Sequence, residues 1–157
     1  MRTAILVFGA LMIASAASAD GWNTYANPRF GVAADYPAIF SMRDPEPDNG
    51  DGQTFHTPGG DATLTIFGSY NANNQSVSGL MQSYKTAGVN YTYSTAGRNW
   101  FVLSGKKDRR IGYLRCNFGP SDVVGCFKLE YLAEDAAEWA PVVERLGRSL
   151  RILTVRQ

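Results

Sequence analysis

The stretch Gly112–Tyr131, GYLRCNFGPSDVVGCFKLEY, decides how the rest of the chain is interpreted. It contains two apolar runs separated by the turn-forming sequence Gly119-Pro120-Ser121-Asp122. Two such runs around a turn predict a β-hairpin. In this hairpin Cys116 and Cys126 would face each other across the two strands. The hairpin would therefore bring the two cysteines close together.

The compartment decides what these two cysteines do. Residues 1–19, MRTAILVFGALMIASAASA, have the form of a signal peptide: Arg2 is followed by an apolar run and by small residues up to Ala19. We expect cleavage near Ala19 and a periplasmic or secreted product. In an oxidising compartment Cys116 and Cys126 should pair as a disulfide. The alternative is a redox-active pair, but the chain has no Cys-x-x-Cys motif.

Length and charge narrow the class of protein further. The apolar run Thr3–Ala14 is shorter than the roughly 20 residues that a transmembrane helix needs, and no later segment is longer. The residue directly after Ala19 is Asp20 and not a cysteine, so we expect no lipid anchor, and the shortness of the apolar runs predicts no transmembrane segment. The chain has 15 basic and 14 acidic residues, one of the basic ones being Arg2. This balance argues against nucleic acid as a partner.

Strand patterns dominate the remainder of the chain. In Ala62–Tyr70, for example, Leu64 and Ile66 alternate with Thr63, Thr65 and Phe67, as expected for a strand with two different faces. Most connections are short, so neighbouring strands should be antiparallel. The expected strands are 22–26, 30–36, 39–42, 54–56, 62–70, 89–95, 100–105, 110–118 and 123–131.

Two helices complete the expected fold. Ser76 can cap a helix over Val77–Ala87 that Gly88 ends. Pro141 suits the first position of a closing helix. The buried stripe of that helix would be Val142, Val143, Leu146 and Leu150. The order of elements predicts an α+β fold, with one largely antiparallel β-sheet flanked by helices, as a single domain over residues 20–157.

Four motifs carry a family resemblance. The first, Tyr25-x-Asn27-x-Arg29-Phe30-Gly31-Val32-x-x-Asp35-Tyr36-Pro37, resembles the opening of domains similar to PsbP, the extrinsic photosystem II protein. The whole order is similar to small exported bacterial proteins of unassigned function. The other motifs are Asn49-Gly50-Asp51-Gly52-x-x-Phe55, Trp100-Phe101-Val102-x-Ser104-Gly105 and Pro141-Val142-Val143-x-Arg145-x-x-x-Ser149-Leu150-Arg151.

This resemblance covers nearly all of residues 20–157. It implies an antiparallel sheet between helices, and it implies a binding or assembly factor rather than an enzyme. It carries over no catalytic residues.

The single histidine, His56, is the candidate general base of a hydrolase. Asp51 or Asp61 would orient it, and Ser104 would be a nucleophile. The chain lacks the Gly-x-Ser-x-Gly motif of a nucleophile elbow. The competing interpretation is a histidine at a strand end with no catalytic role. With one histidine and paired cysteines, a zinc site lacks ligands, so we predict no metal centre of that kind.

The loop Asp44–Gly52 concentrates four carboxylates, those of Asp44, Glu46, Asp48 and Asp51. Three interpretations remain open: a solvated turn, a weak calcium site, or a stiff Pro-Glu-Pro surface for a partner. The spacing does not match an EF-hand, because Asn49 stands where glycine is needed and Phe55 where the closing acid is needed.

Two further features are candidate surfaces. Lys106-Lys107-Asp108-Arg109-Arg110 forms a basic hairpin tip, which either contacts an anionic partner or only aids solubility. Tyr91 and Tyr93 are expected to share a face, where aromatic residues line a ligand groove or pack within the core.

These observations lead to a functional hypothesis. The chain is expected to be an exported, non-enzymatic binding or assembly module of the bacterial cell envelope, whose partner is an unknown envelope protein or small ligand. The expected surfaces are the loop Asp44–Gly52 and the sheet face that the helices leave open. No cofactor is expected beyond weakly bound calcium. The alternatives are the hydrolase that uses His56 and a structural envelope protein without a ligand.

Overall fold

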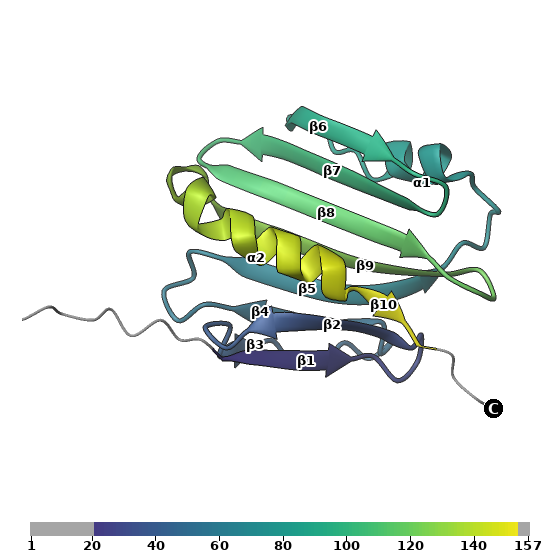
Figure 1. The fold of residues 1–157 in the computed structure, drawn as a ribbon, viewed down its shortest axis with the longest axis horizontal. Helices are drawn as coiled ribbons and strands as arrows, with labels where there is room; N and C mark the ends of the chain where they lie inside the picture. The colour runs from purple at the N-terminus through teal and green to yellow at the C-terminus, as the bar shows by residue number, and fades with distance from the viewer. Residues whose placement is uncertain (1–20, 154–157) are drawn as a thin grey trace, which may run out of the picture.

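Two antiparallel β-sheets make up most of the computed structural model, which describes residues 21–153. The expected signal peptide, residues 1–19, lies outside the described residues. The small sheet has the strand order β1 (Trp22–Ala26), β2 (Val32–Pro37) and β10 (Arg151–Ile152). The large sheet has the order β3 (Met42–Arg43), β4 (Gly52–His56), β5 (Thr63–Tyr70), β9 (Val123–Leu132), β8 (Arg110–Phe118), β7 (Trp100–Lys107) and β6 (Asn90–Ala96) (Figure 1).

The α+β class and the antiparallel pairing are confirmed, but the expected single sheet is divided into two. The cause lies in β2, which pairs along one edge with β1 and along the other with β10. Its buried side chains, such as Val32 and Ala34, pack onto the face of the large sheet against residues such as Leu64 and Phe127. Strand β2 therefore forms a second layer instead of extending the large sheet.

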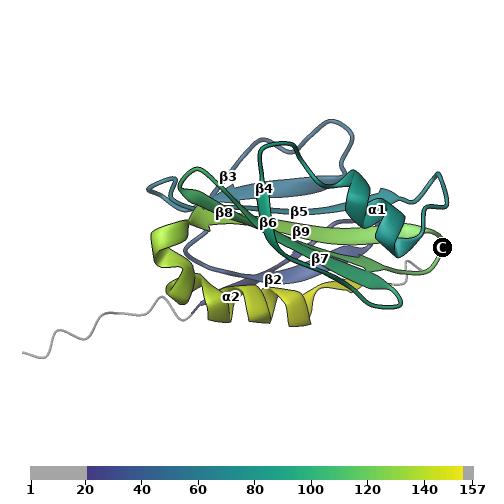
Figure 2. The ribbon, with the colours of Figure 1, turned by 90° about the horizontal axis from the view of Figure 1, so that it is seen from above.

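Each face of the large sheet carries its own apolar core. The α2-side core lies between this sheet, the small sheet and helix α2 (Ala136–Ser149). Figure 2 shows α2 and β2 along the same side of the large sheet. Its buried members are Phe30, Val32, Ala34, Phe40, Phe55, Ala62, Leu64, Ile66, Val123, Phe127, Leu129, Tyr131, Leu146 and Leu150. The α1-side core lies on the opposite face, beneath helix α1 (Val77–Ser83). Its buried members are Met81, Phe101, Leu103, Leu114, Cys116, Val124 and Cys126.

The hairpin predicted around Gly119–Asp122 is confirmed as β8 and β9, and so is the disulfide. Cys116 and Cys126 are direct cross-strand partners whose Cα atoms lie 4.2 Å apart. Both residues are fully buried within the α1-side core. The disulfide therefore joins the central strand of the large sheet, β9, to its neighbour β8 in the core that α1 covers.

Helix α1 begins as predicted but is shorter. The Ser76 hydroxyl accepts the backbone N–H of Gly79 at 3.1 Å, which confirms the N-cap. The helix ends at Ser83 instead of Ala87, and Gly88 has a φ of +80°. The residues that follow α1 leave the helical path and run across the sheet face to β6.

Helix α2 begins five residues before Pro141, so the prediction that Pro141 opens this helix was wrong. A 3₁₀ turn over Ala133–Asp135 precedes the helix. The early start places Trp139 against Tyr131 and Phe40, with ring centroids 5.7 and 5.6 Å apart. Pro141 therefore lies inside the helix, where it lacks the N–H that would bond to the preceding turn.

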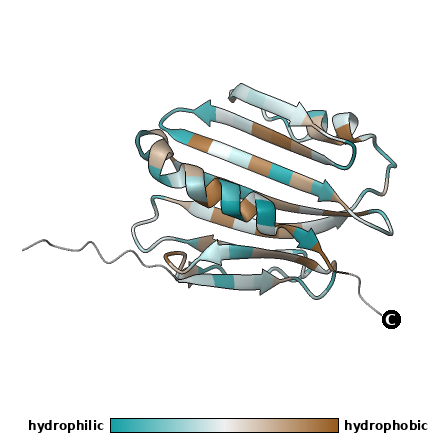
Figure 3. Ribbon diagram, viewed as in Figure 1, coloured by the Kyte–Doolittle hydropathy of each residue, from teal (hydrophilic) through white to brown (hydrophobic). Residues whose placement is uncertain are grey.

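The predicted buried stripe of this helix is confirmed. Leu146 and Leu150 are buried, and Val142 and Val143 pack against the α2-side core. Figure 3 shows the resulting alternation of hydrophobic and hydrophilic segments along α2. Within residues 21–153 neither helix is both long and apolar enough to span a membrane.

Candidate functional site

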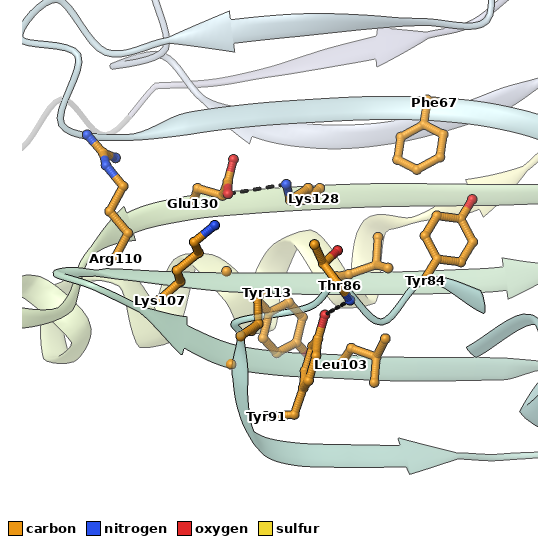
Figure 4. Close-up of a pocket in the computed structure, with 14 residues that line it drawn as sticks. Phe67, Tyr84, Thr86, Tyr91, Leu103, Lys107, Arg110, Tyr113, Lys128 and Glu130 are labelled. Carbon is orange, nitrogen blue, oxygen red and sulfur yellow. Dashed lines mark hydrogen bonds and ion pairs between the residues drawn. The ribbon is translucent and has the colours of Figure 1, made fainter. Parts of the chain in front are cut away.

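Helix α1 covers only part of its face of the large sheet, and a cavity of about 370 Å³ lies beside it (Figure 4). One wall comes from the segment between α1 and β6, and the floor comes from β7, β8 and β9 together with Tyr91 of β6. We call this cavity the groove. Its lining residues are Phe67, Tyr84, Thr86, Val89, Tyr91, Leu103, Gly105, Lys107, Arg110, Gly112, Tyr113, Leu114, Lys128 and Glu130.

The floor of the groove consists of two rows of cross-strand partners, because residues paired across strands share a face. One row runs from Lys128 through Leu114 to Leu103. A second row lies beside the first, two residues nearer to the turn between β7 and β8, and extends onto β6. Its members are Glu130, Gly112, Gly105 and Tyr91. The register of the sheet thus brings residues from four strands into one surface.

A pair of glycines hollows this floor. Gly105 and Gly112 are direct partners across β7 and β8. A Cβ atom on Gly105 would lie 2.6 Å from Cγ1 of Val89, so its absence lets the wall approach the sheet. A Cβ atom on Gly112 would meet only Cγ of Glu130, at 3.9 Å. Glycine within a strand often marks the place where a ligand approaches the backbone, and Gly112 leaves such a place open.

The end of the groove next to α1 is aromatic. The ring of Tyr84 lies 6.5 Å from that of Phe67 and 5.8 Å from that of Phe101, centroid to centroid. Burial raises the pKa of Tyr84 above its ordinary value, and a hydrogen bond with Ser69 opposes the rise. The hydroxyl of Tyr84 therefore stays uncharged at neutral pH. Nearby, the Tyr91 hydroxyl accepts the backbone N–H of Thr86 at 2.9 Å and fixes the wall.

The other end of the groove is charged, as the labelled side chains in Figure 4 show. It carries three cations, Lys107, Arg110 and Lys128, and one carboxylate, Glu130. Lys128 is paired with Glu130 at 3.2 Å. Arg110 donates to the carbonyl oxygens of Gly60 and Asp61, at 3.1 and 3.0 Å.

Two of these cations are not neutralised. Among the residues that the structure describes, no carboxylate forms an ion pair with Lys107 or Arg110. The charged end of the groove therefore keeps an excess of positive charge.

The structure places His56 outside the groove but beside two polar groups. Its Nε2 lies 2.9 Å from Oδ1 of Asp44, and its Nδ1 lies 3.3 Å from Oγ1 of Thr63. Asp44 was predicted for the acidic loop and not as the partner of His56, and Thr63 was missed, because their proximity depends on the pairing of β4 with β5. None of the three lines the groove.

Among the residues that the structure describes, the others proposed for a hydrolase make no hydrogen bond or ion pair with His56. Ser104 lies on β7, one position away from the row that contains Gly105, so it faces the opposite side of the sheet. The carboxylate of Asp51 accepts a hydrogen bond from Asn49 at 2.9 Å. Asp61 lies in the turn between β4 and β5, where its backbone carbonyl binds Arg110. The described residues that contact the His56 ring through hydrogen bonds are Asp44 and Thr63.

The carboxylates of the acidic loop are not gathered either. Asp44 faces His56, and Asp51 faces Asn49. Burial raises the pKa of the Tyr25 hydroxyl, a hydrogen bond with Asn27 opposes the rise, and the negative charges of Glu46 and Asp51 add to it. Within residues 21–153 no three His, Cys, Asp or Glu side chains form a group that could hold a metal ion.

The basic hairpin tip is divided between different surfaces. Lys107 and Arg110 face the groove, whereas Lys106 pairs with Ile111 and faces the opposite side. Arg109 binds Glu134 through both carboxylate oxygens.

The expectation that Tyr91 and Tyr93 share a face was wrong. A bulge between them shifts the register of β6, so Tyr91 pairs with Gly105 and Tyr93 with Ser104. Tyr91 consequently lines the groove, while Tyr93 lies on the opposite face and is 54% exposed.

Comparison with known proteins supports the fold. No family model matches the sequence, and no curated protein matches it. Among solved structures, the solution structure of cyanobacterial PsbP (CyanoP) from Synechocystis sp. PCC 6803 superposes with a TM-score of 0.64 at 10% sequence identity. The match covers 88% of this chain and 96% of that chain. The chain has a PsbP-like fold.

Hydrogen bonds connect three of the four motifs on which the resemblance rests. Asn27 is 1% exposed, and its side chain donates to the carbonyl oxygen of Gly50 at 2.9 Å, which links the first motif to the second. The backbone N–H of Asp35 donates to the hydroxyl of Ser149 at 2.9 Å, which links the first motif to the last. These two hydrogen bonds connect distant elements of the PsbP-like fold, and the charged residues of the groove lie outside the four motifs.

Proposed function

We propose that this protein is an exported, non-enzymatic binding module that holds a small molecule in the groove. The observation that carries the proposal is the cavity of about 370 Å³ with an open glycine floor, an aromatic end and a charged end. Ligand sites are typically concave, of roughly 300–1,000 Å³, with apolar walls and a few polar groups. The groove fits this description.

Several observations support binding over catalysis. The one histidine, His56, is absent from the groove lining, so the groove lacks the base that a hydrolase of the expected kind requires. Within the described part of the chain the lining contains no serine, and its one threonine, Thr86, lies on the wall next to Tyr91. The PsbP resemblance also implies a binding or assembly role, although a shared fold does not fix a function.

Export is supported by two independent features. The sequence of residues 1–19 has the form of a signal peptide. The disulfide between Cys116 and Cys126 suits an oxidising compartment, because such bonds rarely persist in the cytosol.

The test is a ligand screen read by the amide resonances of the groove, with one substitution that closes the cavity. Gly112→Phe should fill the groove, since the side chain would project into open space, whereas Gly112→Ala should leave it open. We expect molecules that shift the resonances of Gly105 and Gly112 to bind wild type and Gly112→Ala, and to lose at least about tenfold in affinity for Gly112→Phe.

Two results would contradict the proposal. One is equal binding of every ligand by the wild type and by Gly112→Phe, which would place the site elsewhere. The other is substrate turnover that His56→Ala abolishes, which would favour the hydrolase.

A further inference from the structure

The geometry of the groove points to a ligand class: we infer that it selects anionic amphiphiles, meaning a hydrocarbon chain or ring that carries one carboxylate or phosphate group. This inference rests on the proposed function and adds the chemistry of the ligand. Its basis is the separation of the lining into an apolar part and a cationic part.

The apolar part can receive a hydrocarbon. Phe67 and Tyr84 close the end next to α1, and Leu103 and Leu114 form the adjoining floor (Figure 4). These side chains belong to or pack against the α1-side core, so the surface is held in place. Because apolar surface gains free energy when it leaves water, a hydrocarbon chain is the chemistry that this end favours.

A bound anion would stabilise the cationic part of the groove, because two positive charges lie there on neighbouring strands. Lys107 and Arg110 are direct cross-strand partners on β7 and β8. Like charges in this position repel one another and destabilise the pair. Arg110 is tied to neutral carbonyl oxygens of Gly60 and Asp61, which leave its charge uncompensated.

One anionic group between Lys107 and Arg110 would convert this repulsion into two charge-assisted interactions. Lys128, the third cation, is already paired with Glu130. That pair is nearly neutral as a unit, and its carboxylate would repel a second anionic group. The ligand should therefore carry one anionic head and not several along its length.

The experiment compares ligands of equal chain length. Octanoate, octyl phosphate and octanol are titrated into the protein, and the amide resonances of Gly105 and Gly112 report binding. We expect octanoate or octyl phosphate to bind at least about tenfold more tightly than octanol. The two anionic arms show whether a carboxylate or a phosphate is preferred. Raising the salt concentration should reduce the difference.

Two lysines provide a matched pair of variants. Lys107→Thr removes a cation at the groove, and Lys106→Thr removes the same charge one residue away on the opposite face of the sheet. We expect Lys107→Thr to bring the affinity for the anionic ligands close to that for octanol. Lys106→Thr should leave the affinities within about twofold of wild type, since an exposed charge on the far face is screened.

The outcomes separate this inference from the proposed function. If octanol binds in the groove as tightly as octanoate and octyl phosphate, the anion selectivity is refuted while the binding module stands. If Lys106→Thr weakens anion binding as much as Lys107→Thr, net charge and not a site accounts for the preference, and the inference is overturned. If no molecule in the ligand screen shifts the groove resonances, both the proposed function and this inference are refuted.

Discussion

The ring of Phe30 lies directly over Gly68, and this contact joins the layer of the small sheet to the large sheet. A Cβ atom on Gly68 would lie 2.5 Å from Cβ and 2.7 Å from Cγ of Phe30. Phe30 is buried, and its ring also packs edge-on against Tyr70 with centroids 5.0 Å apart. The close approach of the two layers at this point therefore depends on a residue without a side chain.

We expect Gly68→Ala to destabilise the protein by about 1–3 kcal/mol, because the added methyl group would displace Phe30 from the α2-side core. Urea unfolding followed by tryptophan fluorescence measures this change. Combining Gly68→Ala with Phe30→Leu should recover part of the loss by giving the methyl group space. An unchanged unfolding midpoint for Gly68→Ala would show that the layers are not packed this closely.

Gly112→Ala should stabilise the protein, in contrast to Gly68→Ala. The added Cβ atom meets only Cγ of Glu130, at 3.9 Å, so it fits the folded state. Replacing glycine by alanine at a compatible position reduces the entropy of the unfolded chain and stabilises by about 0.4–1 kcal/mol. The same urea titration measures this gain. A loss of stability would mean that the floor of the groove is not open at Gly112.

The repulsion between Lys107 and Arg110 should lower the stability of the protein when no ligand is bound. Removing one of two like charges that face each other across strands should stabilise the protein by about 0.2–1 kcal/mol. Thermal unfolding at low salt should therefore show a higher midpoint for Lys107→Thr than for Lys106→Thr, which serves as the control for charge and strand propensity. Equal midpoints would show that Lys107 and Arg110 do not repel each other measurably.

The disulfide should contribute to stability chiefly through the unfolded chain. Its cysteines are separated by 10 positions in the sequence. Closing a loop of this size contributes roughly 2.5–3 kcal/mol on the chain-entropy model. The free energies of unfolding of the oxidised protein and of the double variant Cys116→Ala/Cys126→Ala, measured in urea, should differ by at least this amount, because the variant also loses buried volume. A smaller difference would indicate that the cross-link strains the β8–β9 pair.

Stability should also decline at alkaline pH. Burial raises the pKa values of Tyr25, Tyr84, Tyr113 and Tyr131 above their ordinary value of 10.0. The folded protein therefore holds these protons when the unfolded chain has released them. Their contribution is fully present below pH 10 and is lost as the pH rises through the folded-state pKa values.

Chemical denaturation at a series of pH values, with phenolate absorbance as a second readout, measures this decline. Tyr84→Phe removes one of the four groups and should make the alkaline loss less steep. Stability that stays constant above pH 10 would show that the phenol groups titrate as they do in the unfolded chain.

The sequence predicted most of the elements because their signals are local. The alternation in 62–70 placed Leu64 and Ile66 opposite Phe67 correctly, and the two sets now lie in different apolar cores. Ser76 was recognised as an N-cap from its side chain alone. The start of α2 was missed because the preference of Pro141 for a first turn was weaker than the packing of Trp139, which depends on Tyr131 and Phe40 from distant parts of the chain.

The groove could be predicted only in part, because it depends on register. An open sheet face was expected, and Tyr91 was named as a candidate groove residue. The pairing of Gly105 with Gly112 requires the exact alignment of β7 and β8, which no short motif specifies. The bulge that turns Tyr93 away from Tyr91 is equally invisible in the alternation of residues.

Strand β9 has side chains in both apolar cores, with Val124 and Cys126 on one face and Phe127 and Leu129 on the other. The strand is also paired along both edges, with β5 and with β8. The backbone amides of β9 should consequently exchange their hydrogens with solvent only when the whole domain opens. The floor of the groove, to which β9 contributes Lys128 and Glu130, should then belong to the slowest-exchanging part of the molecule and give a bound ligand a rigid base.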